Sequence, residues 1–257
     1  MTRFKLVAAA AALLAAQSAY GSGMTTGRAD AVRKAVDGAF RPLIREHDIP
    51  GLAIAVSVDG EEHFFTYGVA SREGNVPVSK ETIFEIGSIS KVFTATLASL
   101  AEASARLSWA DHPSRFIPEL KGTPFDRATL LNLGTYTAGG LPLQFPREVG
   151  DHGAMLAYFR KFEPTAEAGT QRTYSNPSLG LLGHVAARAL GGDFSTLMEE
   201  RLFANLGLGG TYIRVPEPAM SRYAWGYDRA NEAVRVNPGL FAEEAYGVKT
   251  NAADMIR

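Results

Sequence analysis

The sequence contains no cysteine among its 257 residues. That absence excludes a thiol nucleophile, a disulfide framework and a zinc site with cysteine ligands, although it is compatible with an oxidising compartment. An excess of charge of one sign is also lacking, because 26 lysine and arginine residues stand against 27 aspartate and glutamate residues, for a formal net charge of −1. The sequence therefore gives no electrostatic reason to expect a nucleic acid or an anionic membrane as a partner.

Two catalytic signatures are missing as well. No G-x-S-x-G elbow occurs, which argues against an α/β-hydrolase. The histidines show neither an H-x-H-x-D motif nor a pair at helical spacing, so we expect no metal and no cofactor. These scattered histidines are His47, His63, His112, His152 and His184.

The first segment, MTRFKLVAAAAALLAAQSAYGSG, has the pattern of a secretory signal peptide. Arg3 and Lys5 precede an apolar run from Leu6 to Ala16, and a small-x-small cleavage site follows at residues 19–21. The apolar run is too short to span a bilayer. We therefore predict that residues 1–21 are a signal peptide directing export to the periplasm, with no membrane span left after its removal.

Past this segment, apolar residues recur at helical spacing from Arg28 to Glu46. Two apolar runs within Leu52 to Val69 are then split by Asp59-Gly60, a dipeptide typical of a tight hairpin turn. From Ile83 to about Leu206 the signals are mostly helical, and from Tyr212 to Gly247 the chain is loop-like and aromatic. A helix followed by an antiparallel hairpin indicates a mixed α/β (α+β) protein.

The segment FEIGSISKVFTATL places Ser88 and Lys91 three residues apart, at the predicted start of a helix. On that helix one turn separates the two side chains, so the lysine amine can reach the serine hydroxyl. A serine becomes a strong nucleophile when a neighbouring base accepts its proton. The alternative interpretation is an N-terminal serine beside a solvent-seeking lysine, on a helix that buries an apolar stripe of Ile89, Val92, Phe93, Leu97 and Leu100.

A second polar group precedes another apolar helix. Asn176 and Pro177 fit the N-cap and the first residue of that helix, so they could be simple helix punctuation. That interpretation leaves Tyr174 unexplained. A tyrosine and an asparagine held at a helix entrance also suit proton transfer and the binding of a polar ligand.

Four segments in this order, FEIGSISKVFTATL, TYTAGGLPLQFP, RTYSNPSLGLLG and EAYGVKTNAADM, resemble class C β-lactamases over essentially the whole chain after the signal. The resemblance implies a penicillin-recognising serine hydrolase fold, with a helix-flanked antiparallel sheet and an inserted all-helical domain. It implies sheet-domain parts at residues 22–85 and 207–257 and a mainly helical domain at 86–206. The family's Lys-Thr-Gly triplet is absent, so we expect a truncation before that strand and weak activity without the C-terminal strands.

By the same resemblance, Ser88 would be the acylated nucleophile and Lys91 its proton-transfer partner. Tyr174 would handle protons with Lys91, and which of the two is the general base stays open. Gln144 and Asn176 would bind the amide of the substrate side chain, and Tyr246 would line the pocket.

The implied function is the hydrolysis of β-lactams, cephalosporins and penicillins among them, through an acyl-enzyme. Within the same fold, a D-alanyl carboxypeptidase or an esterase could use the same residues. A penicillin-binding module that acylates without turnover is a third possibility. We expect a monomer, because no heptad pattern stands out.

Overall fold

The computed structural model describes residues 27–237 and 239–257. The predicted signal peptide lies outside the described residues. The chain divides into two compact units, one running to Lys80 and taking in Ile256, the other comprising Glu81–Met255 and Arg257. The division into sheet and helical domains implied by the resemblance stays a prediction. Within the described ranges, no helix combines the length and the apolar character needed to cross a bilayer.

The first unit consists of a helix and a small antiparallel sheet. Residues 27–46 are helical, and strands β1 (Gly51–Val58), β2 (Glu61–Ser71) and β3 (Val76–Pro77) follow in the order β1-β2-β3. Asp59 and Gly60 turn the hairpin with φ angles of 53° and 83°, and Val58 pairs with Glu61 beside them. This confirms the predicted helix and hairpin, whose turn needs positive φ at both positions.

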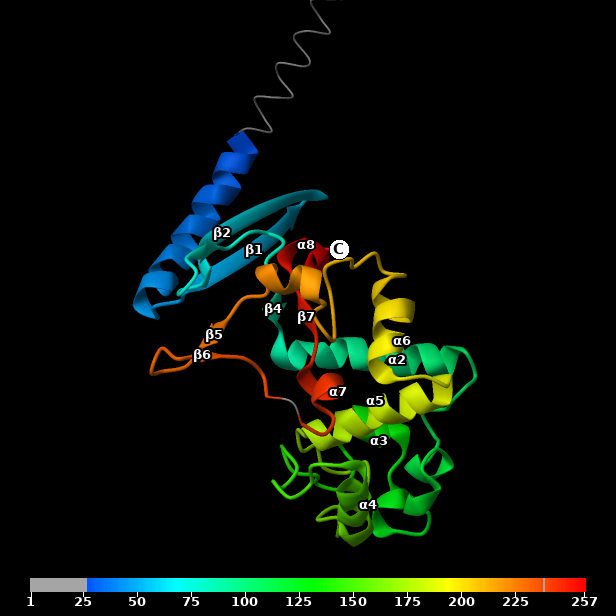
Figure 1. The fold of residues 1–257 in the computed structure, drawn as a ribbon. Coiled ribbons are helices and arrows are strands. Elements are labelled where there is room, and N and C mark those ends of the chain that lie inside the picture. The colour runs from blue at the N-terminus through cyan, green and yellow to red at the C-terminus, as the bar shows by residue number, and fades with distance from the viewer. Residues whose placement is uncertain (1–26, 238) are drawn as a thin grey trace, which may run out of the picture. The chain divides into compact units, whose positions relative to one another are not determined.

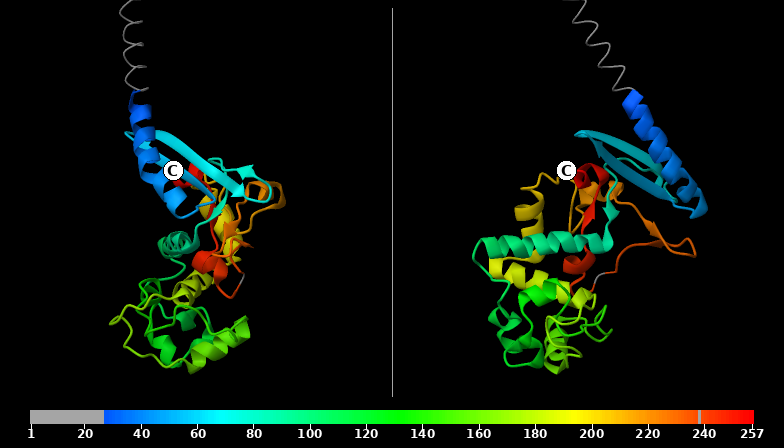
Figure 2. Two further views of the ribbon diagram at one scale, coloured as in Figure 1. Left: turned by 90° about the vertical axis from the view of Figure 1, so that its left-hand side faces the viewer. Right: turned by 180° about the vertical axis from the view of Figure 1, so that it is seen from behind.

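The helix lies along the hairpin, as the two views of Figure 2 show. The Tyr67 hydroxyl donates a hydrogen bond of 2.7 Å to Asp37. The guanidinium carbon of Arg33 lies 5.3 Å from the Phe65 ring centroid, and that of Arg41 lies 5.2 Å from the Tyr67 ring centroid. Charged side chains of the helix thereby contact the strand face on which Phe65 is buried and Tyr67 is partly buried.

The second unit holds the remaining elements, which are mostly helical. Its two-stranded ladders pair β4 (Phe84–Glu85) with β7 (Lys249–Thr250), and β5 (Gly226–Tyr227) with β6 (Ala233–Val234). Its helices are α2 (Ser90–Ala103), α3 (Leu130–Gly134), α4 (His152–Lys161), α5 (Asn176–Leu190), α6 (Phe194–Leu197), α7 (Ala242–Tyr246) and α8 (Ala252–Met255). Short helical turns are η1 (Gly87–Ile89), η2 (Pro113–Arg115), η3 (Pro118–Leu120), η4 (Pro124–Arg127), η5 (Met198–Phe203) and η6 (Glu217–Arg222).

Helix α5 forms the centre of this unit. All but two of its residues are buried, and it packs against α2, α3 and α7. Figure 1 shows the short α7 between α2 and α5. The Phe125 and Phe159 rings stack with their centroids 4.4 Å apart, and they belong to the hydrophobic core that also includes the apolar side chains of α5. Helices α2, α5 and α7 thus pack against one another, and they carry three of the six predicted site residues, namely Lys91, Asn176 and Tyr246.

The predicted apolar stripe on α2 is wrong in part. Ile89 and Val92 are 53% and 64% exposed, whereas Ser90, Lys91 and Thr94 are buried. The buried face of α2 packs against α5 and α7, where small or hydrogen-bonded side chains permit close approach. The interpretation of Lys91 as a solvent-seeking side chain is therefore wrong, since it is only 6% exposed.

The start of α5 also differs from the prediction by one position. Ser175 is the N-cap, and its hydroxyl accepts a hydrogen bond of 3.1 Å from the Ser178 N–H. Asn176 is the first helical residue and Pro177 the second. Because Ser175 satisfies the helix end, the side chain of Asn176 is released from capping.

Candidate active site

Ser88 lies at the junction between β4 and α2. The chain leaves β4, reverses at Gly87 with a φ of 52°, and enters α2 through η1. A side chain at position 87 would meet open space, so glycine is favoured there by backbone conformation alone. The turn leaves Ser88 exposed, just before a helix that buries Ser90, Lys91 and Thr94 on its inner face.

Two donors converge on the Ser88 hydroxyl. Lys91 Nζ donates a hydrogen bond of 3.0 Å to Ser88 Oγ, and the Tyr174 hydroxyl donates one of 2.7 Å to the same atom. Lys91 Nζ also lies 5.1 Å from the centroid of the Tyr174 ring. The structure thus brings Ser88, Lys91 and Tyr174 into direct contact, although 86 residues of sequence separate Ser88 from Tyr174.

Lys91 is held from its far side by the backbone of α7. Its ammonium donates a hydrogen bond of 2.7 Å to the Ala245 carbonyl oxygen. Sequence reasoning missed this contact, because a main-chain carbonyl leaves no signature in residue identity. The ammonium therefore has two fixed acceptors, Ser88 Oγ and Ala245 O, in a largely buried position.

The surroundings of Tyr174 change the acidity of its phenol. Burial acts to raise the pKa of Tyr174, but hydrogen bonds with Lys91 and Ser88 and the charges of Lys91 and Arg172 outweigh it, so the pKa lies below the ordinary value of 10. The ring packs against Tyr136 with centroids 4.9 Å apart. Tyr174 is thus fixed beside Ser88 in a form that loses its proton more readily than a free tyrosine.

Asn176 and Gln144 lie on adjoining segments. The Asn176 N–H donates a hydrogen bond of 3.0 Å to the Leu143 carbonyl, which brings the loop bearing the exposed Gln144 to the start of α5. Asn176 is 8% exposed, and its Oδ1 has no hydrogen-bond partner among the described residues. A buried carbonyl oxygen without a donor is costly, so this atom is suited to accept a hydrogen bond from a ligand.

Tyr246 ends α7, one residue after the carbonyl that holds Lys91. It is partly buried, and burial raises the pKa of its phenol. Among the described residues, hydrogen bonds join Ser88, Lys91 and Tyr174 to one another, whereas Tyr246 is linked to this group through the backbone of α7.

Glu244 is a buried carboxyl that sequence reasoning did not single out. Burial raises its pKa from 4.5 to about 7, and the charges of Glu243 and Asp193 act in the same direction. The folded chain therefore binds the proton of the Glu244 carboxyl more tightly than the unfolded chain does. The stabilisation is complete below about pH 4.5 and is lost as the pH rises to about 7, and it amounts to about 3 kcal/mol.

We expect Glu244→Gln to remove this pH dependence. The free energy of unfolding, measured by urea titration between pH 4.5 and 7, should fall by about 3 kcal/mol more in the original chain than in the variant. Burial lowers the pKa of His184 to about 4, which gives a slope of opposite sign, but that slope is common to both proteins and cancels. A difference that stays constant over this pH range would contradict the assignment.

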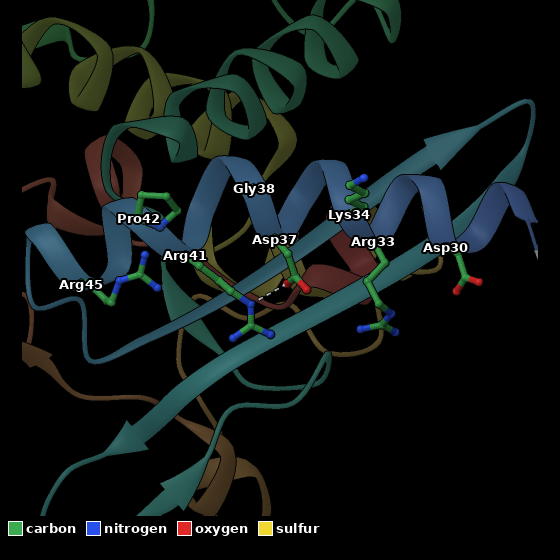
Figure 3. A pocket seen from close by; sticks show the side chains of 8 residues that line it. All are labelled: Asp30, Arg33, Lys34, Asp37, Gly38, Arg41, Pro42 and Arg45. Carbon is green, nitrogen blue, oxygen red and sulfur yellow. Dashed lines mark ion pairs between the residues drawn. The ribbon is translucent and has the colours of Figure 1, made fainter.

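A shallow hollow of about 570 Å³ lies along the helix of the first unit (Figure 3). Its labelled side chains come from that helix, and the ion pair drawn there joins Arg41 to Asp37 at 3.0 Å. None of the predicted site residues lines it. In the part of the chain that the structure describes, no group of three or more histidine or acidic side chains is arranged to hold a metal ion.

Comparison with known proteins gives one family. The family model described as Beta-lactamase matches residues 36–257. A beta-lactamase of Pseudomonas fluorescens is 51% identical over 225 residues, which cover 88% of this chain and 63% of that protein. A beta-lactamase of Escherichia coli (strain K12) is 42% identical over 222 residues, covering 86% of this chain and 59% of that protein. The chain thus spans less than two thirds of the length of these relatives.

Solved structures agree. A class C beta-lactamase in complex with cefoxitin superposes with a TM-score of 0.87 at 40% identity, over 89% of this chain and 64% of that chain. A structure described as a beta-lactamase/D-alanine carboxypeptidase from Pseudomonas syringae superposes with a TM-score of 0.86 at 45% identity, over 88% of this chain and 64% of that chain. The expected penicillin-recognising serine hydrolase fold is thereby confirmed. The chain belongs to the beta-lactamase family, and solved structures of class C beta-lactamases are among those similar to it.

Proposed function

We propose that this chain carries the acylation site of a class C serine β-lactamase, which hydrolyses β-lactams through a covalent intermediate on Ser88. The observation that carries the proposal is the convergence of Lys91 Nζ and the Tyr174 hydroxyl on Ser88 Oγ, at 3.0 Å and 2.7 Å. A nucleophile with two proton-transfer groups in contact is what acyl transfer requires.

In acylation, Ser88 Oγ attacks the carbonyl carbon of the β-lactam ring and the ring C–N bond breaks. The hydroxyl proton passes to Lys91 or Tyr174 and is delivered to the departing ring nitrogen. Negative charge therefore does not build up fully on either Ser88 Oγ or the ring nitrogen. A lowered pKa favours Tyr174 as the base, because more of it is tyrosinate at a given pH. The contact of Lys91 with Ser88 Oγ equally allows the lysine to take part directly.

In deacylation, a water molecule attacks the ester carbon of the acyl-enzyme. The same two groups remove a proton from that water and return one to Ser88 Oγ as the ester bond breaks. The exposure of Ser88 supports this step, because water can approach its ester from solvent. The site therefore uses one pair of proton-transfer groups twice.

Substrate binding in this proposal involves Asn176, Gln144 and Tyr246. The unpaired Oδ1 of Asn176 accepts a hydrogen bond from the amide N–H of the substrate side chain, and the exposed Gln144 binds the same amide from the neighbouring loop. Tyr246 lines the substrate site on the side of α7. Cephalosporins and penicillins both carry such an amide. Between these two substrate classes, we expect the activity to be of the cephalosporinase type.

The test is intact-protein mass spectrometry after brief exposure to a cephalosporin. We expect an adduct that forms on the original chain, decays as hydrolysed drug accumulates, and is absent from Ser88→Ala, because the alanine removes the attacking oxygen. An adduct that persists would point to a penicillin-binding module without turnover. No adduct on a folded chain would contradict the proposal.

A second candidate function is D-alanyl carboxypeptidase activity. It is favoured by the similarity to the Pseudomonas syringae protein, whose description names both activities. The release of D-alanine from a peptide ending in D-Ala-D-Ala, measured beside β-lactam hydrolysis, separates the two. Periplasmic location and a monomeric state are part of the same proposal, and they rest on the signal-like first segment and on the family.

A further inference from the structure

One turn of α2 holds the segment 244–248 through three hydrogen bonds. The Thr94 hydroxyl donates to the Glu244 carbonyl at 2.6 Å, Lys91 Nζ donates to the Ala245 carbonyl at 2.7 Å, and Ser90 Oγ accepts from the Val248 N–H at 3.0 Å. Ser90 and Thr94 are fully buried, so water does not compete for these bonds. The carbonyl that binds Lys91 therefore lies between two other fixed points of the same short segment.

Packing against α5 supports the same arrangement. A Cβ atom at Gly183 would lie 2.8 Å from Thr94 Cγ2 and 2.8 Å from Glu244 Cγ, closer than real carbon contacts allow. The glycine thus leaves the space in which Thr94 and Glu244 meet. Three helices, α2, α5 and α7, converge on this contact.

The consequence for Lys91 follows from the flexibility of its side chain. Four rotatable bonds separate its ammonium from the backbone, and the ammonium has no directional preference of its own. Its position is set by its acceptors, of which Ser88 Oγ is itself part of the reaction. The position of the remaining acceptor, Ala245 O, depends on how firmly the segment 244–248 is held.

We propose that Thr94, together with Ser90, is a positioning residue for Lys91: the two hydroxyls fix residues 244–248, so that the Ala245 carbonyl holds the ammonium against Ser88 and Tyr174. This inference rests on the proposed function for its effect on rate. It concerns geometry that exists in the chain without any substrate. Thr94 does not touch the reacting atoms.

The first experiment compares Thr94→Val with Thr94→Ser in the full chain. Valine keeps the shape of threonine and removes the donor, whereas serine keeps the donor. We expect Thr94→Val to lower the rate constant of acylation by a fluorescent penicillin about 10- to 100-fold, because a small misplacement of a catalytic group is costly. Initial binding should change little, and Thr94→Ser should restore most of the rate.

The matched control is Thr96→Val on the same helix. The Thr96 hydroxyl is exposed and donates to the Val92 carbonyl of its own helix at 2.8 Å, so the substitution removes an equivalent group without touching residues 244–248. We expect no change in acylation. A Thr94→Val chain that acylates like Thr96→Val, or a Thr94→Ser chain as slow as Thr94→Val, would overturn the proposal.

A second readout needs no activity. Tyr174 is titrated by NMR in chains labelled with ¹³Cζ tyrosine, and Tyr174→Phe assigns the signal. Contacts with Lys91 contribute to the lowered pKa of Tyr174. We therefore expect the pKa of Tyr174 to rise in Thr94→Val, where Lys91 is displaced, and to remain unchanged in Thr94→Ser and Thr96→Val. An unchanged titration in Thr94→Val overturns the proposal. If the original chain forms no adduct, the proposed function fails, and this titration still decides the role of Thr94.

Discussion

Replacing Lys91 by methionine is expected to lower the rate constant of acylation by about 10³-fold, within the range by which a positioned acid–base group accelerates a reaction. Methionine occupies a similar length and volume, so the buried space between α2 and α7 stays filled. What is lost is the ammonium that donates to Ser88 Oγ at 3.0 Å and to the Ala245 carbonyl at 2.7 Å. Stopped-flow absorbance with a chromogenic cephalosporin measures the rate.

Lys91→Arg serves as the control for charge. Arginine keeps the positive charge but presents a planar, permanently protonated fork that cannot act as a base. We expect it to remain as slow as the methionine variant, which would show that a point-like amine is needed and not charge alone. Thermal melting of each variant checks that the chain is folded. Acylation of a folded Lys91→Met chain at the original rate would exclude Lys91 from proton transfer.

Tyr174→Phe is expected to lower acylation by about 10²- to 10³-fold and to change its dependence on pH. The pKa of Tyr174 lies below the ordinary value of 10. If its tyrosinate is the base, the rate rises with pH as the phenol ionises and levels above that pKa, so the rising part of the profile lies at lower pH than for a free tyrosine. Phenylalanine removes this rise.

Tyr136→Phe is the matched control, since the Tyr136 ring packs against Tyr174 with centroids 4.9 Å apart. The same loss of a hydroxyl there should leave the rise with pH in place. Acylation rates are measured by stopped flow from pH 6 upward in steps, within the range where both variants remain folded. A profile that is identical in the original chain and in Tyr174→Phe would assign the base role to Lys91.

Much of the site could be predicted from local sequence, where short-range geometry decides the outcome. The positive φ demanded by Asp59-Gly60 identifies the hairpin, and helical spacing alone puts the Lys91 amine within reach of the Ser88 hydroxyl. The contact of Tyr174 with Ser88 spans 86 residues, and no local pattern carries it. Only the resemblance to a family pointed to that pairing.

The rest could not be predicted because it depends on tertiary packing. The acceptors of Lys91 and Thr94 are main-chain carbonyls of residues 244 and 245, and any residue type supplies a carbonyl. The same packing explains the error over Ile89 and Val92. Apolar side chains at helical spacing predict the buried face of a helix only when no other face packs against a neighbouring element. Here the face of α2 that packs against α5 and α7 consists of small and hydrogen-bonded residues.

The way α2 holds the segment 244–248 has a consequence for how the protein can evolve. All three hydrogen bonds engage main-chain atoms of that segment, so none depends on which side chains it bears. Tyr246, which we place in the substrate site, can therefore be exchanged under selection by a new drug while the support of Lys91 is conserved. The residue that affects the substrate range and the carbonyl that supports catalysis can therefore change independently, although they belong to neighbouring residues of one short helix.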